Sequence, residues 1–196
     1  CNMLKYMLLF VGIVFWLYCL TVLKRAKNGA FYFLVGSTGL FIGLLLMSKP
    51  YGIWLFATAM TWAVGLVGQI TGFFTTFYLA HVIQVVNHHH LSLFMIDYEC
   101  SGLIESAAFL GLIAFYPIYS RQHRVILAVL GLIWLFVANI VRLSLVAIMI
   151  HFFGDRVFYL AHAILGRLLF YSLAIILYYL VFTKGQLVNR LFKKLG

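Results

Sequence analysis

The sequence predicts an all-α, polytopic membrane bundle of about six or seven spans that forms one transmembrane domain over residues 1–196. Its residues are 65% hydrophobic and 9% charged, whereas a soluble domain is about half apolar and about a quarter charged. Several apolar runs reach the roughly 20 residues that cross about 30 Å of hydrocarbon. The net charge of +10 comes from basic residues in short turns between these runs, which is typical of membrane topology and not of nucleic-acid binding.

The amino-terminal half begins with two apolar runs. They cover residues 3–23 and 30–47 and are separated by a basic turn at 24–29. The next stretch, 51–83, is apolar but carries several threonines, and two interpretations remain open. It forms two short spans broken near 68–72, or helices that lie in the outer leaflet. Either arrangement returns the chain to the side from which it started.

A polar segment separates the two halves. Residues 85–99 place an Asn-His-His-His sequence between β-prone flanks, which predicts a short hairpin-like loop outside the bilayer. Three consecutive histidines do not share one face of a helix or strand, so at most two could readily bind one ion. We therefore expect no metal and no cofactor.

Three further spans are expected at 103–117, 125–150 and 157–182. Basic residues fill the turn between the first two of these spans and follow the third. Assigning the turns at 24–29 and 119–125 and the carboxyl-terminal tail to the cytoplasm satisfies the positive-inside rule. That side then holds nine of the 14 basic residues, which are Lys24, Arg25, Lys27, Arg121, Arg124, Lys184, Arg190, Lys193 and Lys194.

The opposite side receives only Lys5, Lys49 and Arg156, together with all four acidic residues. The amino terminus is therefore expected outside and the carboxyl terminus inside.

Most of the acidic residues surround one cysteine. Asp97 and Glu99 directly precede Cys100, and Glu105 follows it at the start of an apolar run. The other internal cysteine, Cys19, lies within the first apolar run and is expected to be a packing residue. Cys100 is instead expected at the outer mouth of a span, which makes it a candidate nucleophile.

Two more residues are predicted at the depth of this thiol. Arg142 lies 16 residues after Ile126, about 24 Å above the inner boundary at about 1.5 Å per residue. His162 lies 20 residues before Phe182, about 30 Å above that boundary. An arginine inside a span costs roughly 2.5–3.5 kcal/mol and normally marks function. The sequence thus predicts that a thiol, a guanidinium and an imidazole meet near the outer face.

This set of side chains fits acyl transfer. A helix amino terminus favours the thiolate of Cys100, and a thiolate that attacks a carbonyl gives a thioester. His162 would protonate the leaving amine, and Arg142 would stabilise the oxyanion or hold a substrate carboxylate. Asp97, Glu99 and Glu105 oppose the thiolate, so we assign these carboxylates to orienting His162 or binding substrate.

A second arginine lies within the last span. Arg167 follows His162 by five residues, so it lies about 7.5 Å deeper and on a face turned well away from it. We assign it to helix pairing or to contact with a substrate helix.

At these residues the sequence resembles the exosortases and archaeosortases. The matching pieces are Cys100-Ser101-Gly102 followed by Leu103, Asn139-Ile140-Val141-Arg142, and His162 in the last span. The region that carries them, 85–182, covers about half of the chain, and the chain resembles a small member with fewer spans. The acidic residues just before Cys100 depart from the usual pattern.

The resemblance implies a multi-pass cysteine transpeptidase of a prokaryotic plasma membrane, with its active site facing outside. It makes Cys100, Arg142 and His162 the catalytic residues, with Ser101, Gly102 and Asn139 in support. Its partners would be exported proteins with a carboxyl-terminal sorting signal, which combines a short motif, a transmembrane helix and a basic tail. Two alternatives remain: a non-catalytic scaffold or transporter subunit, and a plain protease that uses water as the acceptor.

Overall fold

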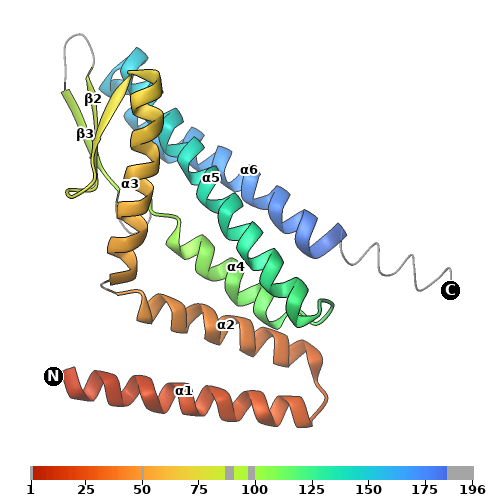
Figure 1. Ribbon diagram of the computed structural model, residues 1–196. Helices are drawn as coiled ribbons and strands as arrows, with labels where there is room; N and C mark the ends of the chain where they lie inside the picture. Colours follow the sequence, from red (N-terminus) through yellow and green to blue (C-terminus); the bar gives the residue numbers. More distant parts are fainter. Residues whose placement is uncertain (1, 50, 87–90, 97–99, 185–196) are drawn as a thin grey trace.

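The computed structural model describes residues 2–49, 51–86, 91–96 and 100–184, and it is mostly helical (Figure 1). In chain order its elements are α1 (Asn2–Arg25), α2 (Gly29–Met47), α3 (Tyr51–Thr71), β1 (Phe74–Phe77), β2 (Val82–Val86), β3 (Leu91–Met95), α4 (Leu103–Phe115), α5 (Arg121–Phe153), the 3₁₀ turn η1 (Asp155–Val157), the π-helix η2 (Leu160–Leu165), α6 (Gly166–Tyr178) and the π-helix η3 (Tyr179–Lys184).

Four helices in the described part of the chain are long and apolar enough to cross a membrane. They are α2, α3, α5 and the helical stretch Asp155–Lys184, which joins η1, η2, α6 and η3. The apolar helix α4 is shorter, with 13 residues. The chain thus has the helices of a membrane protein, but the predicted six or seven spans are not confirmed.

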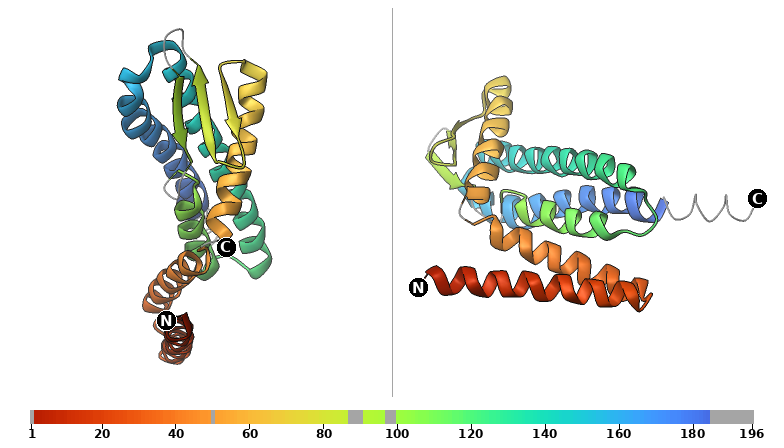
Figure 2. Two further views of the ribbon diagram at one scale, coloured as in Figure 1. Left: turned by 90° about the vertical axis from the view of Figure 1, so that its left-hand side faces the viewer. Right: turned by 60° about the horizontal axis from the view of Figure 1, so that its bottom comes forward.

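The helices divide into a bundle and one crossing helix. Helices α1, α2, α4, α5 and α6 run roughly along one direction, and α3 lies across one end of them together with the sheet (Figures 1 and 2). We call this the sheet end of the bundle. The turn after α1, the turn between α4 and α5, and the end of η3 all lie at the opposite end, which we call the turn end.

The stretch 51–83 corrects the sequence interpretation. It contains one 21-residue helix, α3, followed by β1 and the start of β2, and so matches neither two short spans nor helices alone. Gly72 ends the helical segment with φ +74°, a conformation that glycine adopts without a Cβ clash. The following Phe73-Phe74-Thr75-Thr76-Phe77 is rich in aromatic and β-branched residues, which favour a strand.

The hairpin predicted at 85–99 is present in a larger form. Strands β2 and β3 pair antiparallel with Val82 opposite Met95, so the hairpin begins three residues earlier than predicted. Strand β1, which the sequence interpretation missed, pairs with the other side of β2 and gives the order β1-β2-β3. Residues 87–90, including the three histidines, lie outside the described residues.

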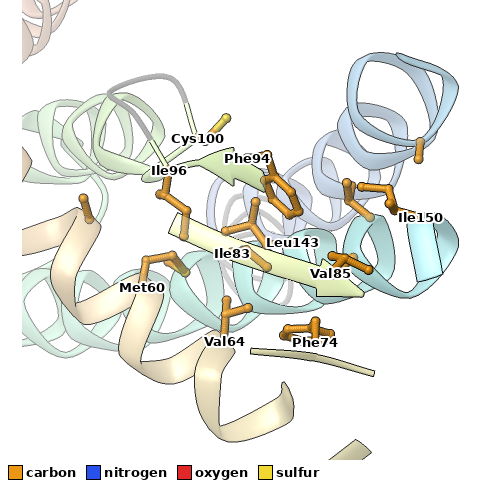
Figure 3. Packing of buried hydrophobic residues seen from close by; sticks show 14 residues of the cluster. Met60, Val64, Phe74, Ile83, Val85, Phe94, Ile96, Cys100, Leu143 and Ile150 are labelled. Atoms are coloured by element: carbon orange, nitrogen blue, oxygen red, sulfur yellow. The ribbon is translucent and has the colours of Figure 1, made fainter. Parts of the chain in front are cut away.

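The sheet packs one face on α3 and α5. Along β3 the burial alternates, so that Ser92 and Phe94 are buried while Leu91, Leu93 and Met95 are exposed, as expected for a strand covered on one side. Figure 3 shows the apolar core that results, to which β1, β2, β3, α3 and α5 contribute. Cys100 belongs to this core. A second core holds α4, α5 and α6 together, with Phe109, Ile113, Leu135, Ala138, Phe170, Leu177 and Val181.

Candidate active site

Cys100 lies in the short turn that leads into α4, and it is 5% exposed. Gly102 is the residue just before the helix and has φ +77°. A Cβ on Gly102 would also lie 3.1 Å from Asn139 Nδ2, so both the conformation and the space favour glycine here. Asn139 Nδ2 donates a hydrogen bond of 2.8 Å to the Cys100 carbonyl. This bond ties the thiol-bearing turn to α5.

Two nitrogen-bearing side chains reach the Cys100 sulfur from different helices. His162 Nε2 of η2 lies 3.5 Å from Sγ, across 62 positions of sequence. Arg142 Nη2 of α5 donates to the same sulfur at 3.9 Å, across 42 positions. The structure therefore brings together the three residues that the sequence places at one depth.

Arg142 is held by contacts on several sides, and it is 4% exposed. Its Nη1 donates to Asn139 Oδ1 at 3.5 Å, and its guanidinium carbon lies 5.8 Å from the centre of the Phe170 ring. Gly166 lets α6 approach α5 closely, because a Cβ there would lie 3.1 Å from Val146 Cγ2 and 3.5 Å from Arg142 Cγ. Arg142 Nε is buried without a hydrogen-bond partner among the described residues.

His162 is partly buried and occupies a π-helical turn, η2. Turns of this kind are rare and occur often at functional sites. The ring of Phe158 stacks on the imidazole with an interplanar angle of 3° and a centroid distance of 5.4 Å. Phe158 in turn lies against Phe94 of β3, with ring centroids 6.1 Å apart. The histidine is thus supported from the sheet through one aromatic side chain.

Sequence reasoning missed Phe158 and Phe170 as supports of the site. Phe158 lies four residues before His162, a spacing at which helical side chains are neighbours, so this contact could have been found from the sequence. Phe170 supports a residue on another helix, and no local spacing predicts that contact.

The remaining predicted site residues have different surroundings. Ser101 is fully buried, and its Oγ accepts a hydrogen bond of 3.4 Å from the Leu103 amide in the first turn of α4. Glu105 is partly buried, and its Oε2 accepts no hydrogen bond from any described residue. Arg167 is exposed on α6, in contrast to Arg142. Asp97 and Glu99 lie outside the described residues.

A thiol that faces an imidazole and a guanidinium is suited to nucleophilic chemistry. Both groups donate hydrogen bonds when protonated, and charge-assisted donors stabilise a thiolate. The imidazole can also carry the thiol proton to another atom. Across the described ranges, no three or more His, Cys, Asp and Glu side chains are grouped so that they could hold a metal ion. Comparison with known proteins gave no match to a protein-family model, to a curated protein or to a solved structure.

Proposed function

We propose that the chain is a membrane-embedded cysteine transpeptidase of the exosortase and archaeosortase type. The observation that carries the proposal is the position of Cys100 Sγ, 3.5 Å from His162 Nε2 and 3.9 Å from Arg142 Nη2. A buried arginine in an apolar helix is expensive, and a packing role for Cys100 would not require one beside the sulfur. A nucleophile that needs an anion-stabilising partner accounts for both residues.

In the proposed first half-reaction, Cys100 attacks a peptide carbonyl of the substrate. His162 takes the thiol proton as the C–S bond forms, and donors of Arg142 stabilise the oxyanion of the tetrahedral intermediate. The C–N bond then breaks, and His162 gives the proton to the leaving amine. The amino-terminal part of the substrate remains on Cys100 as a thioester.

In the second half-reaction, a nucleophilic group of the acceptor attacks the thioester carbonyl. His162 accepts the proton of that group, the C–S bond breaks, and Cys100 leaves as a thiolate that regains its proton. No electrons are exchanged with a redox partner, and the chemistry requires no cofactor. The acceptor decides whether the result is transfer or hydrolysis.

The proposed topology has five spans, which are α1, α2, the shorter α4, α5 and the helical stretch Asp155–Lys184. Helix α3 is also long and apolar enough to cross, but in this proposal it lies with the sheet across the outer face. Two observations support it: α3 crosses the bundle at the sheet end, and the basic turns lie at the turn end (Figures 1 and 2). An odd number of spans also places the two termini on opposite sides, as the distribution of basic residues requires. The thiol then faces the outside of a prokaryotic plasma membrane.

The proposed substrates are exported proteins that end in a short motif, a transmembrane helix and a basic tail. The resemblance of the Cys100, Arg142 and His162 segments to exosortases suggests this class. A nucleophile at the outer end of the bundle suits a substrate that is anchored by its own helix and cleaved just outside it.

Co-expression with candidate proteins that carry such tails tests the proposal. Mass analysis should show loss of the tail, together with an added acceptor mass if transfer occurs. Cys100→Ala should insert in the membrane and leave these proteins uncleaved, whereas Cys19→Ala should be as active as the parent. Processing by Cys100→Ala would instead favour a scaffold that serves another enzyme. Cleavage without an added mass would indicate a protease that uses water.

A further inference from the structure

We propose that the free edge of β3 binds an extended peptide segment of the substrate by strand addition and leads it to Cys100. The inference rests on the proposed function, and it adds where and in what conformation the substrate is recognised. It follows from the hydrogen-bonding pattern of β3, from the exposure of its residues and from its position beside the site.

One edge of β3 has backbone groups that the sheet does not use. The Ile96 amide donates to the His81 carbonyl at 2.7 Å, and residues of an antiparallel pair alternate between bonded and non-bonded positions. Phe94 lies opposite Ile83, two positions from the bonded pair of Ile96 and His81, so its backbone N–H and C=O point toward β2. The backbone N–H and C=O of Leu93 point away from β2. Leu91 and Met95 share the orientation of Leu93. Among the described strands, β3 pairs with β2 alone.

The same three residues present apolar side chains to the surroundings. Leu91, Leu93 and Met95 are 56%, 60% and 67% exposed. Soluble proteins usually protect such an edge with charged residues, proline or a bulge, and the sequence of β3, Leu-Ser-Leu-Phe-Met, contains neither charge nor proline. The edge therefore combines backbone N–H and C=O groups that β2 does not use with exposed apolar side chains. Strand addition uses both features.

The free edge lies on the same side as the nucleophile. Figure 3 shows Cys100 on the side of β3 that faces away from β2. The inward side chains of β3 contact the segment that leads to His162, because Ser92 Oγ donates to Asp155 Oδ1 and Phe94 lies against Phe158. A peptide placed along the free edge would thus run beside the histidine-bearing segment toward the sulfur.

The opposite edge of the sheet does not offer an equivalent place. Strand β1 packs against α3, and Thr76 of this strand approaches α3 closely at Gly65. Of the two sheet edges formed by the described strands, the open one is therefore the edge beside Cys100.

An extended peptide suits this edge better than a helix does. A helix satisfies its own backbone groups, whereas an extended segment offers unpaired N–H and C=O groups along its length. The recognition segment of the proposed substrates comes just before an apolar helix, so it is free to be extended. Strand addition would supply affinity through the main chain and would read only alternate side chains.

A pair of electrophilic probes tests this inference without a known substrate. The first is acetyl-Val-Thr-Val chloromethyl ketone, whose chloride the Cys100 thiolate displaces to form a C–S bond. The second is chloroacetone, which has the same electrophile and no peptide. Both rates of Cys100 modification are measured by mass spectrometry on the full chain in detergent. The rate with the peptide probe divided by the rate with chloroacetone reports peptide docking. We expect N-methylation of the Thr amide to lower this ratio about fivefold, the effect of one typical hydrogen bond.

Leu93→Pro supplies the matching change in the protein. It removes a free-edge N–H that β2 does not use, and proline is tolerated on edge strands. We expect the rate ratio to fall about fivefold, with the chloroacetone rate unchanged. Leu93→Ala keeps the N–H and should retain a ratio within about twofold of the parent.

The outcomes separate the two proposals. If chloroacetone does not modify Cys100 in the parent chain, the proposed nucleophile is wrong. If chloroacetone reacts but Leu93→Pro leaves the ratio at the parent value, strand addition at β3 is wrong and the nucleophile stands. If Leu93→Pro changes the oligomeric state and not the ratio, the edge pairs with a second copy of the chain, which also overturns the proposal.

Discussion

At the scale of single residues, the site depends on two basic side chains that reach one sulfur from different helices. Each lies against a phenyl ring, His162 on Phe158 and Arg142 near Phe170. Aromatic contacts of this kind restrict a side chain without removing its hydrogen-bond donors. The rings therefore fix the two groups on sides that leave their contacts with the Cys100 sulfur in place.

Arg142 and Arg167, which lie well inside the last two spans, should respond differently to replacement by lysine. Arg142 is buried and shares its guanidinium between Cys100 and Asn139, and lysine cannot reproduce that planar fork. We expect Arg142→Lys to lower the processing rate about 10²–10³-fold, as loss of an oxyanion donor does. Arg167 is exposed on α6, and a lysine charge can still serve a helix pair or a substrate contact there. The processing rate of Arg167→Lys should therefore stay within about threefold of the parent rate.

Processing rate and expressed amount, measured for both variants, check this assignment. A well-expressed but inactive Arg167→Lys beside an active Arg142→Lys would place the reacting groups deeper in the bundle than Cys100.

Phe158 should act as a positioning residue for His162. Phe158→Leu removes the stacked ring, an interaction of about 0.5–1.5 kcal/mol beyond buried area, so we expect kcat to fall about two- to tenfold with KM little changed. Phe158→Tyr keeps the ring and should restore most of the rate. A rate that drops equally in both variants, or a change confined to KM, would show that stacking does not position the imidazole.

At the scale of elements, the sequence was informative wherever a regular helix sets the geometry. A rise of about 1.5 Å per residue places Arg142 and His162 at one level, and the structure has both within 4 Å of Cys100 Sγ. The π-helical turn around His162 and the strand β1 depend on tertiary packing, which no local period encodes. Asp97 and Glu99 lie outside the described residues, so their predicted roles stay predictions.

The turn before α4 should tolerate no side chain at Gly102. Gly102→Ala combines a positive φ with a Cβ 3.1 Å from Asn139 Nδ2, so we expect a loss of about 1–2 kcal/mol of stability and slower alkylation of Cys100. Gly43→Ala is the matched control in α2, where a Cβ would meet nothing within 4 Å and alanine favours the helix. Thermal unfolding in detergent checks both variants. If Gly102→Ala and Gly43→Ala unfolded at the same temperature, the turn before α4 would not require glycine at position 102.

At the scale of the whole molecule, the bundle and the sheet end have separate roles. The helices supply the apolar surface that composition alone predicts, and the sheet with α3 covers α5 at the sheet end, next to Cys100. Composition could not reveal the sheet. Strand β1 and part of β2 lie within residues 51–83, and this stretch is as apolar as a membrane span. Its apolar side chains pack on α5, so hydropathy alone does not distinguish them from lipid-facing residues.

Accessibility labelling tests the proposed topology. In a background without Cys1, Cys19 and Cys100, we expect Tyr78→Cys at the exposed turn of the sheet to react with a membrane-impermeant maleimide in intact cells. Gln122→Cys, at the start of α5 at the turn end, should react only after the cells are opened. The reverse pattern would put the sheet and the site on the cytoplasmic face and exclude exported substrates.

The most direct test of the central claim is capture of the thioester on Cys100. A co-expressed exported protein with a sorting tail should be released by added hydroxylamine as a carboxyl-terminal hydroxamate, because hydroxylamine attacks the thioester carbonyl and frees the thiolate. Intact-mass measurement should find this product with the parent chain and with Cys19→Ala, and not with Cys100→Ala. Cleavage that persists in Cys100→Ala, or that yields no hydroxamate with the parent chain, would contradict the account.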